Sequence, residues 1–276
     1  MTDNLKPMPD ETELRGAIRL DRRLDPLSGR LSGFPWWLLA IFLIAIWTAY
    51  FIFTRQNFRA AFDFIIIGIS ITITTTLYAF GIAIVIGLIA GLGKVSRNPL
   101  LRNIARLYVE LVRGIPILVL IFYVALVAVP DISRSLGVDN DLPLNVRAII
   151  ALSITYGAFL AEIFRAGIQS IGRGQMEAAR SLGMSYSQSM RYVILPQAIR
   201  NVLPALGNEF VAMVKDSSLV SVLAVRDITQ VARLYAGRTF RFREAYSILA
   251  VLYLTMTLIL SFVVQWIERR LDAGRR

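Results

Sequence analysis

The 276-residue chain contains no cysteine and no histidine. These absences exclude thiol nucleophiles, zinc sites built from Cys and His, haem ligation by either residue and imidazole acid–base catalysis. Charged residues are scarce at 18%, whereas hydrophobic residues make up 56%. Soluble domains have about 25% charged and about 45–50% apolar residues, because enough polar surface must face water. The apolar excess therefore predicts a protein whose surface contacts membrane lipid, and it excludes a disordered chain, a disulfide scaffold and an ordinary cytosolic enzyme.

Six apolar segments are long enough, or nearly long enough, to cross a bilayer, which takes about 20 residues of helix. They cover residues 35–53, 64–93, 114–130, 148–161, 198–222 and 245–267. The segment 198–222 is the least obvious, since it carries Glu209, Lys215 and Asp216. Pro116 is expected to kink or restart the third helix. The predicted fold class is an all-α, polytopic membrane protein with six transmembrane helices.

Positive charge predicts the orientation of these spans, because cytosolic segments carry an excess of Lys and Arg. With the N-terminus inside, the inner segments hold about twice as many Lys and Arg residues as the outer ones. This bias places both termini in the cytoplasm and accounts for the net charge of +11 without a nucleic-acid partner. The segment 223–244, with its five arginines, is the exception. If residues 198–222 did not cross, this segment would lie inside and the C-terminus outside, an arrangement against which the basic C-terminal tail argues.

The N-terminal part divides into two regions. Residues 1–33 are polar and mixed in charge, with several Pro, Ser and Gly residues, as is typical of a poorly ordered cytosolic leader. Residues 34–54 are apolar over too long a run for a signal peptide, and no small-residue cleavage site follows them. We therefore expect an additional N-terminal transmembrane helix ahead of the main transmembrane domain, residues 64–270.

Glycines in the second span have two interpretations. Residues 91–96 faintly resemble a phosphate-binding loop, but the Walker A pattern is incomplete there. Gly87 and Gly91 form a small-x-x-x-small face of the kind that lets membrane helices approach closely. The sequence favours helix packing, and it shows no ATP site.

Four charged residues lie inside or beside the weaker spans: Glu162, Glu209, Lys215 and Asp216. Charge is costly in lipid, so these side chains should face protein or water. Glu209 and Asp216 are seven residues apart and share one helical stripe, from which Lys215 points away. The four residues either form internal ion pairs or line a translocation path for a charged or zwitterionic solute. Neither a catalytic group nor a metal site is evident in the sequence.

A polar segment after the fourth span, residues 166–197, is predicted to form a compact cytosolic projection. An amphipathic helix runs to Leu182, and Gly183 is suited to end it because glycine readily adopts positive φ. Ser185 can cap a second helix, and Pro196 ends that helix or begins the next span. Such a projection is either a solvated linker or a docking element for a cytosolic partner.

The spacing in this segment resembles the EAA loop of bacterial ABC importer permeases, with the pattern E-A-A-x3-G-x9-I-x-L-P. The residues at these positions are Glu177, Ala178, Ala179, Gly183, Val193, Leu195 and Pro196. Val193 in place of Ile is the only departure. Further stretches resemble the polar amino-acid uptake permeases of the histidine/glutamine type, at residues 108–116, 161–168, 207–210 and 215–219. The resemblance extends over about residues 64–270.

This resemblance implies a type I ABC importer permease-like (MetI-like) bundle in the bacterial plasma (inner) membrane. Such a chain is the transmembrane subunit of an ATP-driven importer for polar amino acids and not an enzyme. Its implied partners are a second permease subunit (the same or a sister chain), an extracytoplasmic solute-binding protein and an ABC ATPase dimer. That ATPase would hold the ATP and Mg, so this chain itself would carry no cofactor. The resemblance assigns coupling to the ATPase to the residues at the EAA positions: Glu177, Ala178, Ala179, Gly183, Leu195 and Pro196.

Some features leave other classes open. The extra span at 34–54 and the leader depart from the many members of this branch that have five spans. The alternative function is a secondary transporter or channel for a small polar solute, which would lack an EAA-type loop and often shows inverted repeats. A membrane-embedded enzyme would need convergent catalytic groups. Neighbouring genes for an ATPase and a solute-binding protein would distinguish the importer from both.

The predicted orientation can be tested with reporter fusions. We expect a cytosolic reporter to be active at both termini and at residue 180, because positive charge retains these segments inside. A fusion at residue 134, in a predicted outer connection, should show the opposite activity and serves as the control. A periplasmically active reporter at residue 180 would contradict the docking interpretation.

Overall fold

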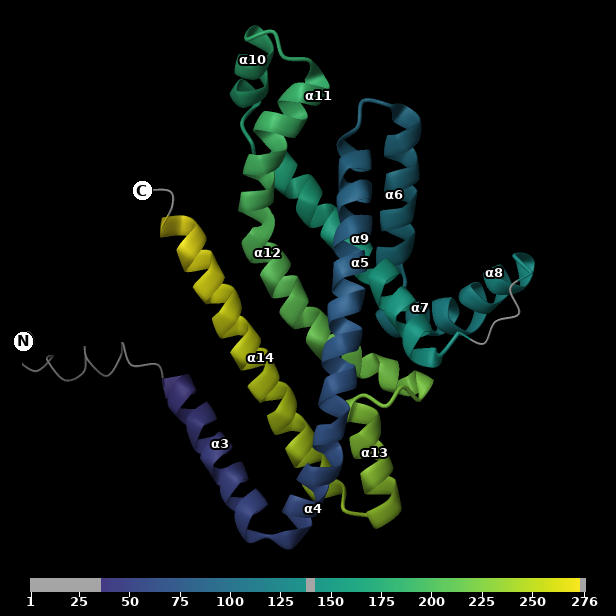
Figure 1. Ribbon diagram of the computed structural model, residues 1–276, viewed down its shortest axis with the longest axis vertical. Helices are drawn as coiled ribbons and strands as arrows, with labels where there is room; N and C mark the ends of the chain where they lie inside the picture. The colour runs from purple at the N-terminus through teal and green to yellow at the C-terminus, as the bar shows by residue number, and fades with distance from the viewer. Residues whose placement is uncertain (1–35, 138–141, 274–276) are drawn as a thin grey trace, which may run out of the picture. The chain divides into compact units, whose positions relative to one another are not determined.

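The computed structural model describes residues 36–137 and 142–273, and within these ranges every regular element is a helix (Figure 1). The predicted all-α class is therefore confirmed. By its internal contacts the chain divides into two compact units, residues 1–50 and 51–276. The predicted leader, residues 1–33, lies outside the described residues.

Helix α3 (Trp36–Thr54) belongs mainly to the first unit and ends just inside the second. Its 19 residues include no charged side chain, as suits a helix whose backbone hydrogen bonds are satisfied internally in lipid. The helix lies where the sequence predicts one. Its role as an additional transmembrane helix stays a prediction.

The second unit is a succession of helices. Its α-helices are α4 (Gln56–Ile65), α5 (Ile69–Val95), α6 (Pro99–Gly114), α7 (Ile117–Tyr123), α8 (Val129–Ser135), α9 (Leu144–Gln169), α10 (Arg173–Ser181), α11 (Tyr186–Ser189), α12 (Leu195–Asp216), α13 (Ile228–Thr239) and α14 (Phe242–Ala273). The 3₁₀-helices η1 (Ile66–Gly68) and η4 (Ser217–Leu223) and the π-helices η2 (Val124–Ala128) and η3 (Met190–Ile194) join some of them. As a result α4 to α5, α7 to α8 and α11 to η4 each form one continuous helical run.

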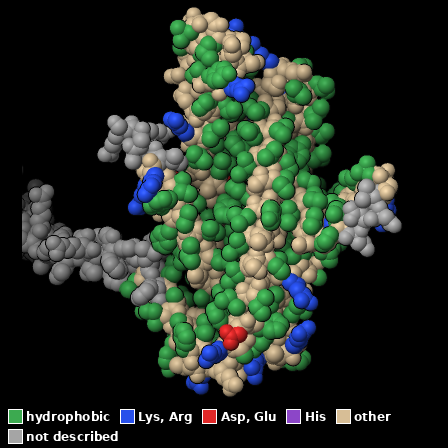
Figure 2. Space-filling view, in the orientation of Figure 1, with side chains coloured by type: hydrophobic (Ala, Val, Ile, Leu, Met, Phe, Trp, Pro, Cys, Tyr) green, Lys and Arg blue, Asp and Glu red, His purple; other side chains and the backbone are tan. Residues whose placement is uncertain are grey.

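Four runs among the described residues are long and apolar enough to cross a membrane: Gln56–Val95, Ile117–Ser135, Leu144–Gln169 and Phe242–Arg270. They correspond to the second, third, fourth and sixth spans predicted from the sequence. The fifth predicted segment, 198–222, coincides with α12 and η4, whose charged residues lower its apolar character. Pro116 separates α6 from α7, so the expected restart of the third span occurs there. On the face in Figure 2, hydrophobic side chains predominate, and Lys and Arg lie toward both its upper and its lower end.

Helix α9 forms much of the core of the second unit, and α5 packs along it more extensively than any other helix does. A Cβ atom at Gly87 would lie 2.6 Å from the Cβ of Leu160, and one at Gly91 would lie 2.8 Å from the Cβ of Phe164. Real Cβ atoms do not approach so closely, so glycine at both positions is what allows this helix separation. The helix-packing interpretation of this glycine pair is confirmed.

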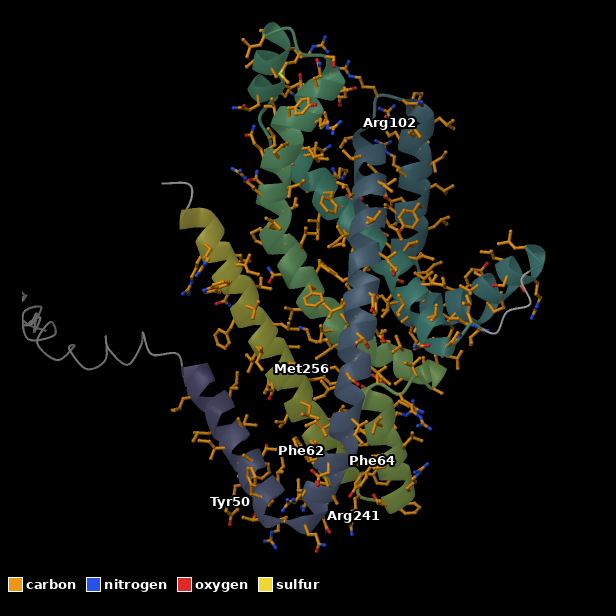
Figure 3. All side chains as sticks on the ribbon, in the orientation of Figure 1. Tyr50, Phe62, Phe64, Arg102, Arg241 and Met256 are labelled. Carbon is orange, nitrogen blue, oxygen red and sulfur yellow. The ribbon has the colours of Figure 1, made fainter. Side chains whose placement is uncertain are left out.

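A second core, centred on Ile228, joins α4, α13 and α14. Partly buried side chains packed against it include Phe62, Phe64 and Met256 (Figure 3). Asp227 caps α13, because its Oδ1 accepts the N–H of Gln230 at 2.8 Å, and burial raises the pKa of this carboxyl to about 6. The N–H of Ile228 donates to Thr72 Oγ1 at 3.1 Å, which fixes the start of α13 against α5.

The glycine contact can be tested by overpacking it. Gly87→Leu should lower the thermal unfolding temperature of the purified chain in detergent, because the added side chain meets Leu160 and strained packing costs about 1–3 kcal/mol. Gly81→Leu is the matched control, since a Cβ at this exposed position of α5 meets nothing within 4 Å. Equal unfolding temperatures for the two variants would show that α5 and α9 are not so close.

Candidate functional site

The projection predicted at residues 166–197 is built around a turn at Gly183. Its φ of +84° lies in the left-handed region, and a Cβ there would meet nothing within 4 Å, so only the backbone angle demands glycine. The N–H of Gly183 donates to the Arg180 carbonyl at 3.0 Å, and that of Met184 donates to the Ala179 carbonyl at 3.3 Å. This pair of bonds is the Schellman arrangement that closes a helix C-terminus. The predicted stop of α10 at this glycine is confirmed.

The second short helix begins with a capping box. Ser185 Oγ accepts the Gln188 N–H at 3.2 Å, and the Gln188 side chain accepts the Ser185 N–H at 2.8 Å. The predicted cap at Ser185 is thus confirmed. Two adjacent caps leave few orphan backbone groups in the turn, which makes it a defined connection and not a loose linker.

The chain then continues from α11 through η3 into α12 without a break. Of the two roles predicted for Pro196, the structure has the second, because this residue lies in the first turn of α12. Proline has no N–H to donate, and the preceding π-turn accommodates that loss: the Leu195 N–H donates to the Met190 carbonyl, and Gln197 Nε2 donates to the Val193 carbonyl at 2.9 Å. Residues 166–197, called the coupling segment after the role predicted for them, are therefore in helical continuity with α12 from Tyr186 onward.

One face of the coupling segment is buried and another is open. A small cluster around Ile168, Ile194 and Ala198 holds the segment against the bundle, and Ala179 is also buried. Glu177 and Ala178 are exposed, and Leu182 is 85% exposed at the tip of α10. Leu195 is half-buried and Pro196 exposed. The EAA-like residues thus divide between anchoring the segment and forming its free surface.

Glu162 stands in a cluster of charges that joins three helices. Its side chain is 17% exposed and forms a hydrogen-bonded ion pair with Lys94 of α5, whose side chain is 8% exposed. Arg165 Nε donates to Glu162 Oε2 at 2.6 Å, and Arg113 Nη1 of α6 lies 3.8 Å from Glu162 Oε1. Lys94 Nζ also lies 3.9 Å from Glu110 Oε1. Helical spacing suggests that Glu110 pairs with Arg106 or Arg113, yet its ion-pair partner among the described residues is Lys94.

The other charged residues lie on α12. Asp216 accepts a hydrogen bond from the hydroxyl of buried Tyr156 at 2.8 Å. Glu209 is half-buried, whereas Lys215 is exposed. Six residues separate Tyr156 from Glu162 on α9, so about 9 Å of helix rise divides this polar pair from the Glu162 cluster. The structure therefore brings Glu162 together with basic residues and not with the α12 carboxylates.

The sequence does not reveal the partners of Glu162 and Asp216. Lys94 is 68 positions from Glu162, and Tyr156 is 60 positions from Asp216. The only local signal was a Lys at the end of a long uncharged run. In the described parts of the chain, no group of three His, Cys, Asp or Glu side chains could hold a metal ion.

Comparison with known proteins places these features in context. Residues 83–273 match the family described as "Binding-protein-dependent transport system inner membrane component". The chain is 36% identical over 220 residues to a probable amino-acid permease protein, YxeN, of Bacillus subtilis (strain 168), covering 79% of this chain and 95% of the relative. It is 35% identical over 211 residues to the glutamine transport system permease protein GlnP of Escherichia coli (strain K12), covering 76% and 94%.

Two solved structures are similar as well. An amino acid ABC transporter with histidines shares 40% sequence identity at a TM-score of 0.67, covering 75% of this chain and 94% of that chain. The methionine ABC transporter MetNI, in an inward-facing conformation, shares 22% identity at a TM-score of 0.64, covering 75% and 96%. The second likeness concerns the fold alone, and it supports the predicted MetI-like bundle.

The Lys94–Glu162 pair can be tested by removing its cation. Lys94→Met should lower the unfolding temperature of the purified chain, because breaking a buried ion pair from one side typically costs about 3–5 kcal/mol. A double-mutant cycle with Glu162→Gln isolates the contribution of the pair itself, because Glu162 keeps Arg165 as a partner when Lys94 is removed. Lys215→Met, which removes an exposed Lys, is the control. A Lys94→Met variant as stable as this control would mean that the pair does not hold the helices together.

Proposed function

Since this chain belongs to the family of binding-protein-dependent transport system inner membrane components, we propose that it forms the pathway of an ATP-driven importer for polar amino acids and couples that pathway to cytosolic ATPase subunits. Membership makes the chain a permease subunit of an ABC importer and not an enzyme. It also favours the importer over the secondary transporter or channel considered from the sequence.

The substrate class is supported by the relatives and by charge. The relatives carry names of amino-acid and glutamine transport, and the similar structure is an amino acid transporter with histidines. Within this chain, Glu209 and Asp216 place negative charge on one stripe of α12, where an ammonium group could be matched. We propose that these two residues, with Glu162 and Lys215, contribute to the polar path.

Coupling is proposed to run through the open face of α10. The observation that carries this proposal is the capped turn at Gly183, which holds α10, with exposed Leu182 and Glu177, against α11, from which the helix runs unbroken into α12. A partner groove that captures this face would turn ATPase movement into movement of α12. The ATPase dimer would supply ATP and Mg. A second permease subunit and an extracytoplasmic solute-binding protein would complete the importer, with both termini of this chain in the cytoplasm.

Two substitutions test the coupling surface. Glu177→Lys reverses the only acidic charge of α10, and losing one partner of a buried interfacial charge pair typically costs about 2–5 kcal/mol. Gly183→Val forces a β-branched residue into positive φ, at about 1–3 kcal/mol. Both should reduce recovery of a co-expressed ATPase and lower uptake, while membrane insertion is retained.

Matched controls accompany these variants. Gly174→Val introduces the same side chain at a glycine of α10 that has open space and no positive φ, and Val193→Ile restores the residue of the EAA pattern. Both should behave like the wild type. Normal transport and normal ATPase recovery by Glu177→Lys and Gly183→Val would refute the coupling role. Gene deletion that spares uptake of all labelled amino acids but lowers uptake of a sugar would refute the substrate class.

A further inference from the structure

A positively charged cavity of about 560 Å³ lies beside the coupling segment. It is formed by the α5–α6 turn, one face of α6, the end of α9 and the first residues of α10. Its basic side chains are Lys94, Arg102, Arg106 and Arg173, and none of its lining residues is acidic. Figure 3 places Arg102 at the end of the bundle near α11, opposite the end that holds Arg241.

Three of these four cations lack a counter-charge among the residues that the structure describes. Lys94 is neutralised by Glu162, but Arg102, Arg106 and Arg173 form no ion pair within 4.0 Å among the described residues. Arg102 and Arg106 are four residues apart on α6, a spacing at which like charges repel. An anion bound in the cavity would relieve that repulsion.

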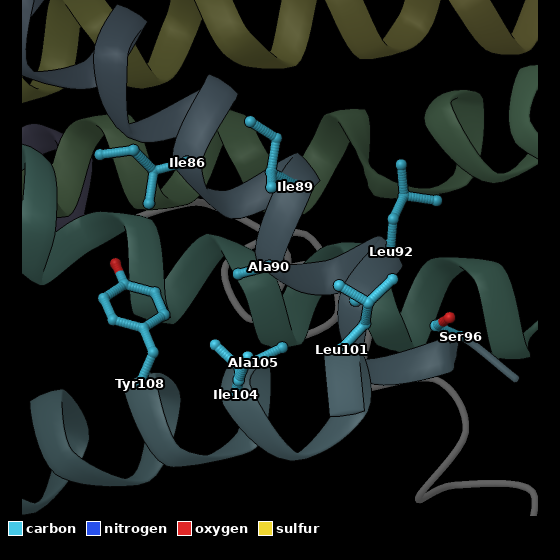
Figure 4. A pocket seen from close by; sticks show the side chains of 10 residues that line it. Ile86, Ile89, Ala90, Leu92, Ser96, Leu101, Ile104, Ala105 and Tyr108 are labelled. Carbon is cyan, nitrogen blue, oxygen red and sulfur yellow. The ribbon is translucent and has the colours of Figure 1, made fainter. Parts of the chain in front are cut away.

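An apolar groove of about 660 Å³ adjoins this cavity at Ser96, which lines both (Figure 4). It lies between α5 and α6, and its lining includes the exposed side chains of Ile89, Leu101 and Ile104. From Ile86 to Ser96 the groove follows α5 for about 15 Å of helix rise. That length accommodates most of an extended acyl chain.

We propose that an anionic phospholipid of the cytosolic leaflet binds here, with its phosphate among the arginines and an acyl chain in the groove. The two adjoining cavities match the two parts of such a molecule: basic pockets between membrane helices on the cytosolic side suit lipid head groups, and an apolar groove suits a hydrocarbon chain. A free phosphate would use only the first cavity. The level of the site in the membrane rests on the orientation given in the proposed function.

The site connects lipid to the coupling segment. Arg102 and Arg106 belong to α6, whereas Arg173 and Met176 belong to α10. Arg97, from the α5–α6 turn, lies over the Tyr186 ring of α11 at 4.3 Å and closes the same region. A bound phosphate therefore bridges α6 and the coupling segment, and occupancy should steady the position of α10.

Lipid binding is measured by native mass spectrometry of the full-length chain in detergent, with phosphatidylglycerol and phosphatidylcholine of equal chain length. The wild type should prefer phosphatidylglycerol. Arg102→Gln/Arg106→Gln should weaken that binding roughly tenfold or more, because each basic residue contributes to anionic-lipid affinity. The control is Arg233→Gln/Arg238→Gln, which removes two exposed arginines of α13, and it should keep the preference.

A groove variant separates lipid from free phosphate. Ile89→Ser/Ile104→Ser should weaken phosphatidylglycerol binding, and millimolar inorganic phosphate should not displace the lipid from the wild type. Equal binding of both lipids by the wild type, or an equal loss in the α13 control, overturns the site. Displacement by inorganic phosphate together with an unaffected groove variant overturns the lipid assignment. This assay needs neither ATPase nor transport, so its failure would leave the proposed function standing.

Discussion

The close approach of α5 to α9 is the constraint on which the rest of the second unit depends. It requires glycine at Gly87 and Gly91, where any side chain would overlap Leu160 or Phe164. With the two backbones this close, Lys94 at the end of α5 comes within reach of Glu162 on α9. The packing at the two glycines thus brings Lys94 and Glu162 together. Arg113 of α6 also lies near Glu162, which links α6 to the pair.

Helices α10 to α12 differ from the closely packed pair α5 and α9, which we call the fixed pair. The segment is closed at its turn by two caps and is continuous with α12 through a π-turn. Near the turn it is attached to the bundle by a small apolar cluster around Ile194, whereas α12 packs along α9 and α14 and enters the main core through Val202, Leu206 and Met213. Movement captured at α10 would therefore pass through this rigid connection to α12, and from α12 to the helices that pack on it.

Local signals in the sequence predict the helices, the turn at Gly183 and its caps. The contacts between distant residues depend on the tertiary structure and are not predicted. Gly183 and Ser185 are readable because each acts on backbone groups within three or four residues of itself. Four of the predicted spans are readable from composition and recur among the described helices, whereas α12 carries charges and is not one of those four. The Lys94–Glu162 pair and the Tyr156–Asp216 bond join residues at least 60 positions apart, and the cationic cavity collects side chains from several helices. No local sequence pattern predicts contacts between residues so far apart in the chain.

The most direct test of the account is a pair of distances in the assembled importer, measured with spin labels. Because the chain has no cysteine, labels at Gln175→Cys, Asn208→Cys and Leu107→Cys report only the chosen positions. The distance between residues 175 and 208 should be the same with and without ATP, since α10 and α12 move as one body. The distance between residues 175 and 107 should change, because residue 107 lies on α6, which packs against the fixed pair α5 and α9. A 175–208 distance that changes with ATP while 175–107 stays constant would contradict the account.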